Sequence, residues 1–108
     1  MKLHGLKTCD TCRKALKALR TAGREVEFVD LRAAPPSRGF VDALLAAHGE
    51  DALNRRSKTW AGLPEAERDL PVADLLLRHP ALIKRPVIVT EDGIYLGWTD
   101  TVRAALIS

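Results

Sequence analysis

Apolar and polar positions near the start of the chain follow two different periods. Lys2–Leu6 is a short, largely apolar segment that predicts an opening strand. The apolar positions that follow recur at helical spacing. They are Cys12, Leu16, Leu19 and Ala22. We expect a helix here that Thr8 or Asp10 caps and Gly23 ends. Val26–Leu31 alternates in part and predicts a second strand.

The middle of the chain carries helical patterns between proline breaks. Pro35-Pro36 ends the preceding pattern, and Ser37 is placed to cap a helix that Gly49 closes. Asp51–Leu63 predicts a short helix with an irregular exit. Pro71 then stands where the first turn of another helix accepts proline.

The last third of the chain predicts a hairpin and a closing helix. Pro86–Thr90 is a strongly apolar strand, and Asp92-Gly93 is a common turn of β-hairpins. Ile94–Gly97 is the expected return strand. Thr99 or Asp100 is placed to cap the last helix.

The order of these elements predicts the fold class. Strand, helix and strand form a βαβ unit, whose two strands we expect to pair in parallel. A hairpin and a helix complete a small mixed sheet flanked by helices. This is an α/β, thioredoxin-like outline in a single domain over residues 1–108, with a helical insertion at about residues 35–80.

Composition narrows the class of protein. The chain is 46% hydrophobic and 29% charged, which excludes a disordered or fibrous protein. Seventeen basic and fourteen acidic residues leave a charge of +3. That mild excess suits anionic small ligands and gives no reason to expect nucleic acid as a partner. We also expect no membrane span and no signal peptide, hence a cytoplasmic protein whose two cysteines are functional thiols.

Those cysteines form a Cys-x-x-Cys motif, Cys9 to Cys12, between the first strand and the first helix. In a βαβ unit this placement is typical of redox-active thiols. The positive end of a helix stabilises a thiolate, Lys7 and Arg13 add positive charge, and Asp10 opposes them. We expect Cys9 to be the more exposed thiol and Cys12 to face the apolar side, where an inert buried thiol is the alternative.

A pair of cysteines can also serve as zinc ligands. A zinc site needs two further ligands, and His4 and His79 are far apart and show no second metal-like spacing. We therefore expect no metal.

Three segments together resemble the ArsC-like, arsenate reductase-related family. They are residues 7–16 around the cysteine motif, Asn54-Arg55-Arg56 with Trp60, and residues 79–87, which run His-Pro-Ala-Leu-Ile-Lys-Arg-Pro-Val. They follow the family's order and span nearly the whole chain.

The resemblance implies a thioredoxin-like fold with a helical insertion and a specific site. The family's nucleophile falls on Cys9, its anion-binding arginine on Arg85, and its cis-proline on Pro86. An arginine fork suits an oxyanion or a glutathione carboxylate.

The remaining site positions stay open. The family's second arginine falls on Arg55 or Arg56, although a gapless alignment puts Asn54 there. Arg13 is a further candidate, as an electrostatic helper rather than a direct ligand. Cys12 is a candidate resolving thiol.

The resemblance also implies the reaction. Its reductases take electrons from glutathione and glutaredoxin, or from thioredoxin, and no bound cofactor is expected. We therefore expect a thiol-dependent oxidoreductase in which Cys9 attacks a disulfide or an anionic small molecule.

Two departures from the arsenate reductases favour the short YffB-like branch, with glutathione-dependent thiol reduction. Leu96–Thr99 lacks their third arginine, and Gly5 stands where they carry a histidine. The alternatives are an arsenate reductase and a Spx-type redox-sensing regulator that binds RNA polymerase.

Overall fold

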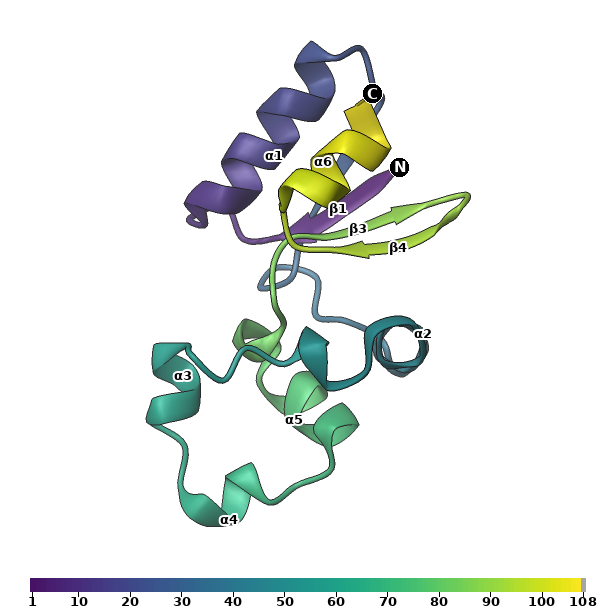
Figure 1. Cartoon of the computed structure of the whole chain (residues 1–108). Helices are drawn as coiled ribbons and strands as arrows, with labels where there is room; N and C mark the ends of the chain where they lie inside the picture. The colour runs from purple at the N-terminus through teal and green to yellow at the C-terminus, as the bar shows by residue number, and fades with distance from the viewer. Residues whose placement is uncertain (108) are drawn as a thin grey trace. The chain divides into compact units, whose positions relative to one another are not determined.

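The computed structural model describes residues 1–107, which divide into two compact units (Figure 1). The first unit consists of Met1–Leu31 and the chain from Arg85 onward. The second unit, Arg32–Lys84, contains the insertion expected at about residues 35–80. Within the described residues, no helix has both the length and the apolar character needed to cross a membrane.

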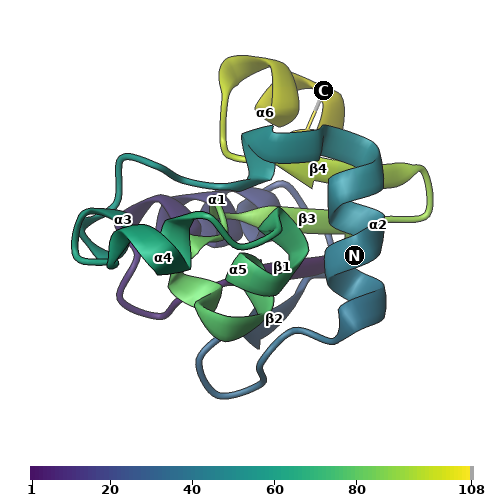
Figure 2. The same ribbon diagram turned by 90° about the horizontal axis from the view of Figure 1, so that it is seen from below.

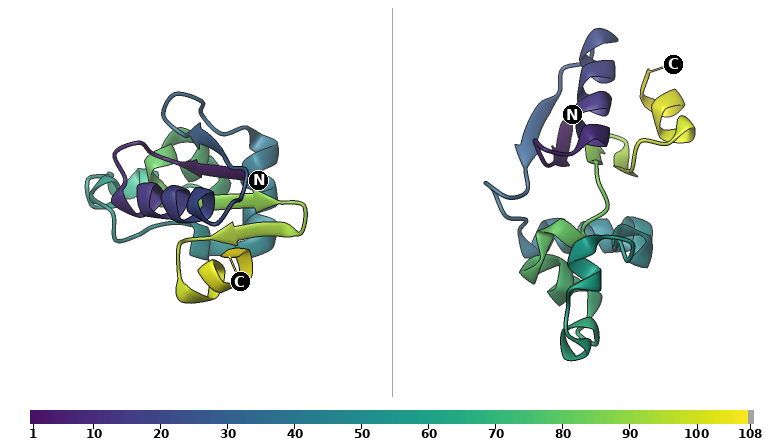
Figure 3. Two further views of the ribbon diagram at one scale, coloured as in Figure 1. Left: turned by 90° about the horizontal axis from the view of Figure 1, so that it is seen from above. Right: turned by 90° about the vertical axis from the view of Figure 1, so that its left-hand side faces the viewer.

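The first unit is built on a four-stranded mixed sheet in the order β2-β1-β3-β4. Its strands are β1 (Lys2–Gly5), β2 (Glu27–Asp30), β3 (Val87–Thr90) and β4 (Gly93–Leu96). β1 pairs in parallel with β2 and antiparallel with β3. β3 and β4 form the hairpin seen in the left view of Figure 3. The predicted βαβ unit and hairpin are therefore confirmed.

One face of this sheet is covered by α1 (Asp10–Thr21) and α6 (Asp100–Ile107), which lie side by side in Figure 1. Leu3 on β1 lies opposite Ile88 on β3, and both are fully buried beneath the helices. Arg24, in the turn after α1, donates from Nη1 to the Leu106 carbonyl of α6 at 3.0 Å. The buried cluster contains Leu3, Cys12, Ala15, Leu19, Val26, Ile88, Val102 and Leu106.

The start of α1 differs from the expectation. We predicted Thr8 or Asp10 as the cap, but Cys9 occupies the N-cap position and Asp10 is the first helical residue. A carboxylate in the first turn is favoured by the helix dipole, so Asp10 suits either position. The buried face also includes Ala15 and leaves Ala22 exposed, because the helix ends at Thr21.

The second unit is helical. Its elements are α2 (Arg38–His48), η1 (Gly49–Ala52), α3 (Lys58–Ala61), α4 (Glu65–Arg68), α5 (Val72–Arg78) and η2 (Pro80–Leu82), which Figure 2 shows from below. Of the stretch 51–63, where one short helix was expected, only Lys58–Ala61 is α-helical, and the first two residues of the stretch belong to η1. Leu53 bridges to Ile83, and the Asn54 side chain accepts a hydrogen bond from the Arg56 amide at 3.1 Å. This turn separates η1 from α3, because a short polar side chain competes with helical hydrogen bonds.

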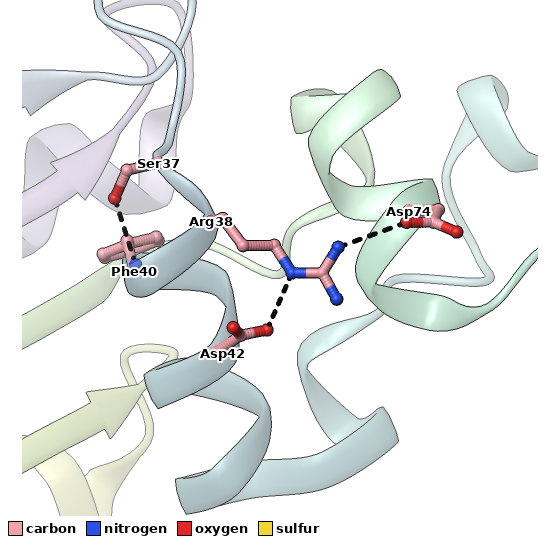
Figure 4. Close-up of polar contacts among 5 residues, drawn as sticks. All are labelled: Ser37, Arg38, Phe40, Asp42 and Asp74. Atoms are coloured by element: carbon pink, nitrogen blue, oxygen red, sulfur yellow. Dashed lines mark hydrogen bonds and ion pairs between the residues drawn. The ribbon is translucent and has the colours of Figure 1, made fainter.

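The predicted cap of α2 is confirmed. Ser37 Oγ accepts from the Phe40 amide at 3.1 Å (Figure 4). Arg38 then reaches Asp42 on its own helix at 3.1 Å and Asp74 on α5 at 3.4 Å. These contacts are exposed and add little stability, so the buried apolar side chains hold the unit together. These are Val41, Leu44, Ala52, Leu53, Leu75, Leu76, Leu82 and Ile83.

Candidate active site

The site begins where the loop after β1 turns into α1. The Cys9 amide donates to the Leu6 carbonyl at 3.1 Å, and the Cys9 carbonyl accepts from the Arg13 amide at 3.1 Å. The backbone of Cys9 is thus fixed on both sides. Its half-buried side chain lies at the positive end of a twelve-residue helix. Helix termini of this kind favour a negative charge.

Sheet pairing brings Arg85 to the same place. β3 runs antiparallel to β1 with Val87 opposite His4, so the residues just before β3 lie beside the end of β1. The Arg85–Pro86 peptide bond is cis, as the resemblance implied. Arg85 is half-buried, its Nε is buried, and its guanidinium lies near enough to Cys9 to lower the pKa of that thiol.

The surroundings of Cys9 favour its thiolate. Burial alone would raise the pKa of Cys9, but the Cys12 amide, the Cys12 thiol and Arg85 together bring it below its ordinary value. Among the described residues the sulfur makes no strict capping hydrogen bond, so the Cys12 amide acts on it as a nearby dipole. A lowered pKa is what a cysteine nucleophile needs at neutral pH.

The second thiol behaves in the opposite way. Cys12 is fully buried, and burial raises its pKa to about 11, reinforced by the neighbouring Cys9 and opposed in part by the Leu6 amide. The two thiols are therefore driven apart, one toward the thiolate and one toward the protonated form. Such a split identifies a proton donor and a charged partner within one pair. As expected, Cys9 is the more exposed of the two.

Leu6 is a contributor that the sequence pattern did not indicate. Its carbonyl holds the Cys9 amide at 3.1 Å, and its own amide approaches the Cys12 thiol. Both contacts come from the backbone, so the identity of the side chain carried no signal of them.

Arg13 lies on the exposed face of α1, where its guanidinium pairs with Asp10. The positive charge that we expected it to add next to Cys9 is thus shared with the opposing carboxylate. Its membership of the anion site stays a prediction.

The candidates of the middle block belong to the second unit. Arg55 pairs with Glu50 and lies 5.6 Å from the centre of the Trp60 ring, which Arg68 also approaches at 5.5 Å. The backbone amide of Arg56 serves the turn at Asn54. Trp60 thus packs with arginines within its own unit, and a role of Arg55 or Arg56 at Cys9 stays a prediction.

Within residues 1–107, histidine, cysteine, aspartate and glutamate side chains form no group of three placed to hold a metal ion.

These features define a class: a thioredoxin-like domain with a Cys-x-x-Cys pair at the start of its first helix and a cis-proline beside it. The sequence of residues 4–105 matches the ArsC family, and the chain belongs to that family.

Known proteins agree in fold and family. The solved structure of a protein named YFFB has 32% identity to this chain, covers 99% of it and 98% of its own chain, and superposes with a TM-score of 0.89. This neighbour confirms the thioredoxin-like fold.

Two curated relatives have informative names. An arsenate reductase of Rhizobium meliloti is 36% identical over 94 residues, which cover 82% of this chain and 67% of the relative. The global transcriptional regulator Spx of Streptococcus pyogenes is 31% identical over 108 residues, covering 92% of this chain and 79% of the relative. Arsenate reductases among the relatives support thiol oxidoreductase chemistry at the level of the family.

Proposed function

We propose that this chain is a glutathione-dependent thiol/disulfide reductase with Cys9 as its nucleophile. The observation that carries the proposal is the position of Arg85, which sheet pairing and the cis bond to Pro86 place beside Cys9 at the start of α1. This arrangement favours a thiolate and also supplies a permanent positive charge next to it.

The reaction has two stages. The Cys9 thiolate forms a bond to one sulfur of a substrate disulfide, and the substrate's S–S bond breaks. Its electron pair leaves on the other sulfur, which takes up a proton. A second thiol then attacks Cys9 and releases the remaining half of the substrate as a thiol.

That second thiol is either glutathione or Cys12. By the first route Cys9 becomes glutathionylated, and another glutathione frees it. By the second route a Cys9–Cys12 disulfide forms, and two glutathione molecules reduce it. In both cases one substrate disulfide and two glutathione molecules give two thiols and one glutathione disulfide. Glutaredoxin or thioredoxin are the protein donors that suit the same step.

Arg85 has two roles in this proposal. It stabilises the thiolate, and its fork binds a carboxylate of glutathione or an anionic substrate. Pro86 fixes the backbone that carries it. Arg55 and Arg13 are proposed as further positive groups for the same anion.

Cys9→Ser is the first test. We expect it to abolish glutathione-dependent reduction of a small mixed disulfide, because the hydroxyl is not ionised at neutral pH. The assay follows formation of glutathione disulfide through a coupled reductase. Turnover that persists in Cys9→Ser would remove Cys9 as the nucleophile.

Cys12→Ser separates the two resolving routes. Retained turnover in this variant means that glutathione resolves the intermediate directly. A trapped adduct on Cys9, seen by mass spectrometry, means that Cys12 is required.

Arsenate reduction is the second candidate, because a relative covering most of this chain carries that name. The same assay with arsenate, glutathione and glutaredoxin decides it. An inactive protein that captures RNA polymerase would instead indicate a Spx-type regulator.

A further inference from the structure

Gly5 is the last residue of β1 and one of its buried positions. A Cβ placed on it would lie 2.5 Å from Cys12 Sγ and 3.1 Å from Cys12 Cβ. The first separation is shorter than two such atoms can approach. The Cys12 sulfur therefore occupies space that only glycine leaves at this position.

Neither partner can move away without cost. Gly5 is paired with Asp30, and its carbonyl accepts from the Leu31 amide at 2.9 Å, so β1 is held in place. Cys12 is fully buried in the cluster that includes Leu3, and the Leu6 amide acts on its sulfur. A tightly packed core transmits such a clash rather than absorbing it.

We propose that Gly5 is a positioning residue. Because it has no side chain, it leaves a space beside β1, here called the seat, which holds the Cys12 sulfur where its thiol can act on Cys9. The inference rests on the proposed role of Cys9 as nucleophile and adds a residue to it. An isolated glycine in a strand often marks such a close approach. Here the residue that approaches the glycine is Cys12 on α1, three residues after the proposed nucleophile.

The seat matters for the charge of Cys9. A seated Cys12 keeps its proton and donates toward the Cys9 sulfur, against the effect of burial on the pKa of Cys9. A methyl group at position 5 displaces the Cys12 sulfur and weakens this donation. The expected consequence is a smaller fraction of Cys9 thiolate at neutral pH.

The test compares Gly5→Ala, Cys12→Ala and the double variant. The pH dependence of Cys9 alkylation by iodoacetamide is measured on each, with the modified site assigned by peptide mass. We expect Gly5→Ala to slow alkylation at neutral pH severalfold and to move the profile to higher pH. In the Cys12→Ala background the sulfur is gone and only the 3.1 Å approach to the Cβ of residue 12 remains, so the same change should have a much smaller effect. Gly39→Ala is the matched control, since its Cβ meets only Ser37 Oγ at 3.9 Å.

Two results would overturn the inference. One is an unchanged profile in Gly5→Ala, and the other is an equal shift with and without Cys12. Should Gly5→Ala fail to fold, folding of the double variant becomes the test, because that variant lacks the Cys12 sulfur. A folded double variant supports the seat. A double variant that still fails to fold would assign the clash to the Cβ of residue 12 rather than to its sulfur, and would contradict the seat. Alkylation needs no turnover, so a failure of the reductase proposal is read separately from a failure of this one.

Discussion

Arg85 is the cation that acts on Cys9, although Lys7 and Arg13 are its closer neighbours in the sequence. Against the effect of burial, Arg85 helps to lower the pKa of Cys9, while Arg13 pairs with Asp10. Arg85 acts on Cys9 in place of Arg13 because of where the two residues lie. Arg13 is on the exposed side of α1, whereas sheet pairing places Arg85 beside the end of β1. A half-buried charge is also less screened than an exposed one.

Arg85→Ala should therefore slow Cys9 alkylation at neutral pH severalfold. Losing the guanidinium raises the pKa of Cys9, so the rate should reach its plateau at higher pH. The measurement is the rate of reaction with iodoacetamide across pH. Arg103→Ala, which removes an exposed arginine from α6, is the control for net charge. A profile that shifts equally in both variants would show that only the overall charge matters.

The motif, the strand order and the family resemblance predicted Cys9, Cys12 and Arg85 as candidate site residues. They could not predict the contacts of Leu6 or the close approach at Gly5. Those depend on backbone atoms and on which face of β1 meets α1. A glycine in the printed sequence shows that no side chain is there, but it does not show what fills the space.

Among the helices, predicted caps were confirmed where a hydroxyl accepts a hydrogen bond from an amide of the first turn. Ser37 caps α2 through its hydroxyl, and Thr99 does the same for α6 by accepting from the Val102 amide at 3.1 Å. At α1 two polar candidates competed, and the N-cap fell on Cys9 between them. In residues 51–63, the turn that Asn54 forms with the Arg56 amide interrupts the helix that the sequence pattern had predicted.

The end of α1 gives a prediction about backbone conformation. Gly23 has φ of +85°, and a Cβ built there would meet open space among the described residues. Gly23→Ala should thus be penalised by conformation alone, by about 1 kcal/mol. Gly39→Ala, within α2, should instead stabilise by about 0.5 kcal/mol, since alanine restricts the unfolded chain. Denaturant unfolding measures both, and an equal effect of the two substitutions would contradict the argument.

On the scale of the whole molecule, the chain divides into a sheet unit and a helical unit. The order of elements in the sequence was enough to predict the sheet and its pairing. It was not enough to predict α4, because Glu65–Arg68 has no apolar periodicity and no buried residue. Contacts around it hold that turn: Arg68 donates to the carbonyls of Trp60 and Ala61, at 3.3 and 3.0 Å.

The buried thiol should also make the stability of the whole protein depend on pH. Cys12 has a pKa raised to about 11, chiefly by burial, whereas the unfolded chain releases this proton near the ordinary thiol value. Below that ordinary value both states are protonated and the contribution is fully present. As the pH rises toward 11, the unfolded state ionises first, so the free energy of unfolding falls.

The measurement should be made in the Cys9→Ser background, because the lowered pKa of Cys9 gives a contribution of opposite sign. That contribution grows as the pH rises through the folded pKa of Cys9, and would mask the fall due to Cys12. Cys9→Ser and Cys9→Ser/Cys12→Ala are compared by urea unfolding at about pH 8 and about pH 10. The two variants differ only at position 12, so the comparison isolates the contribution of Cys12. We expect the variant that keeps Cys12 to lose about 1 kcal/mol more, since one pKa unit corresponds to about 1.4 kcal/mol. Equal losses would mean that Cys12 ionises as readily in the folded protein as in the unfolded chain, which its burial under β1 should prevent.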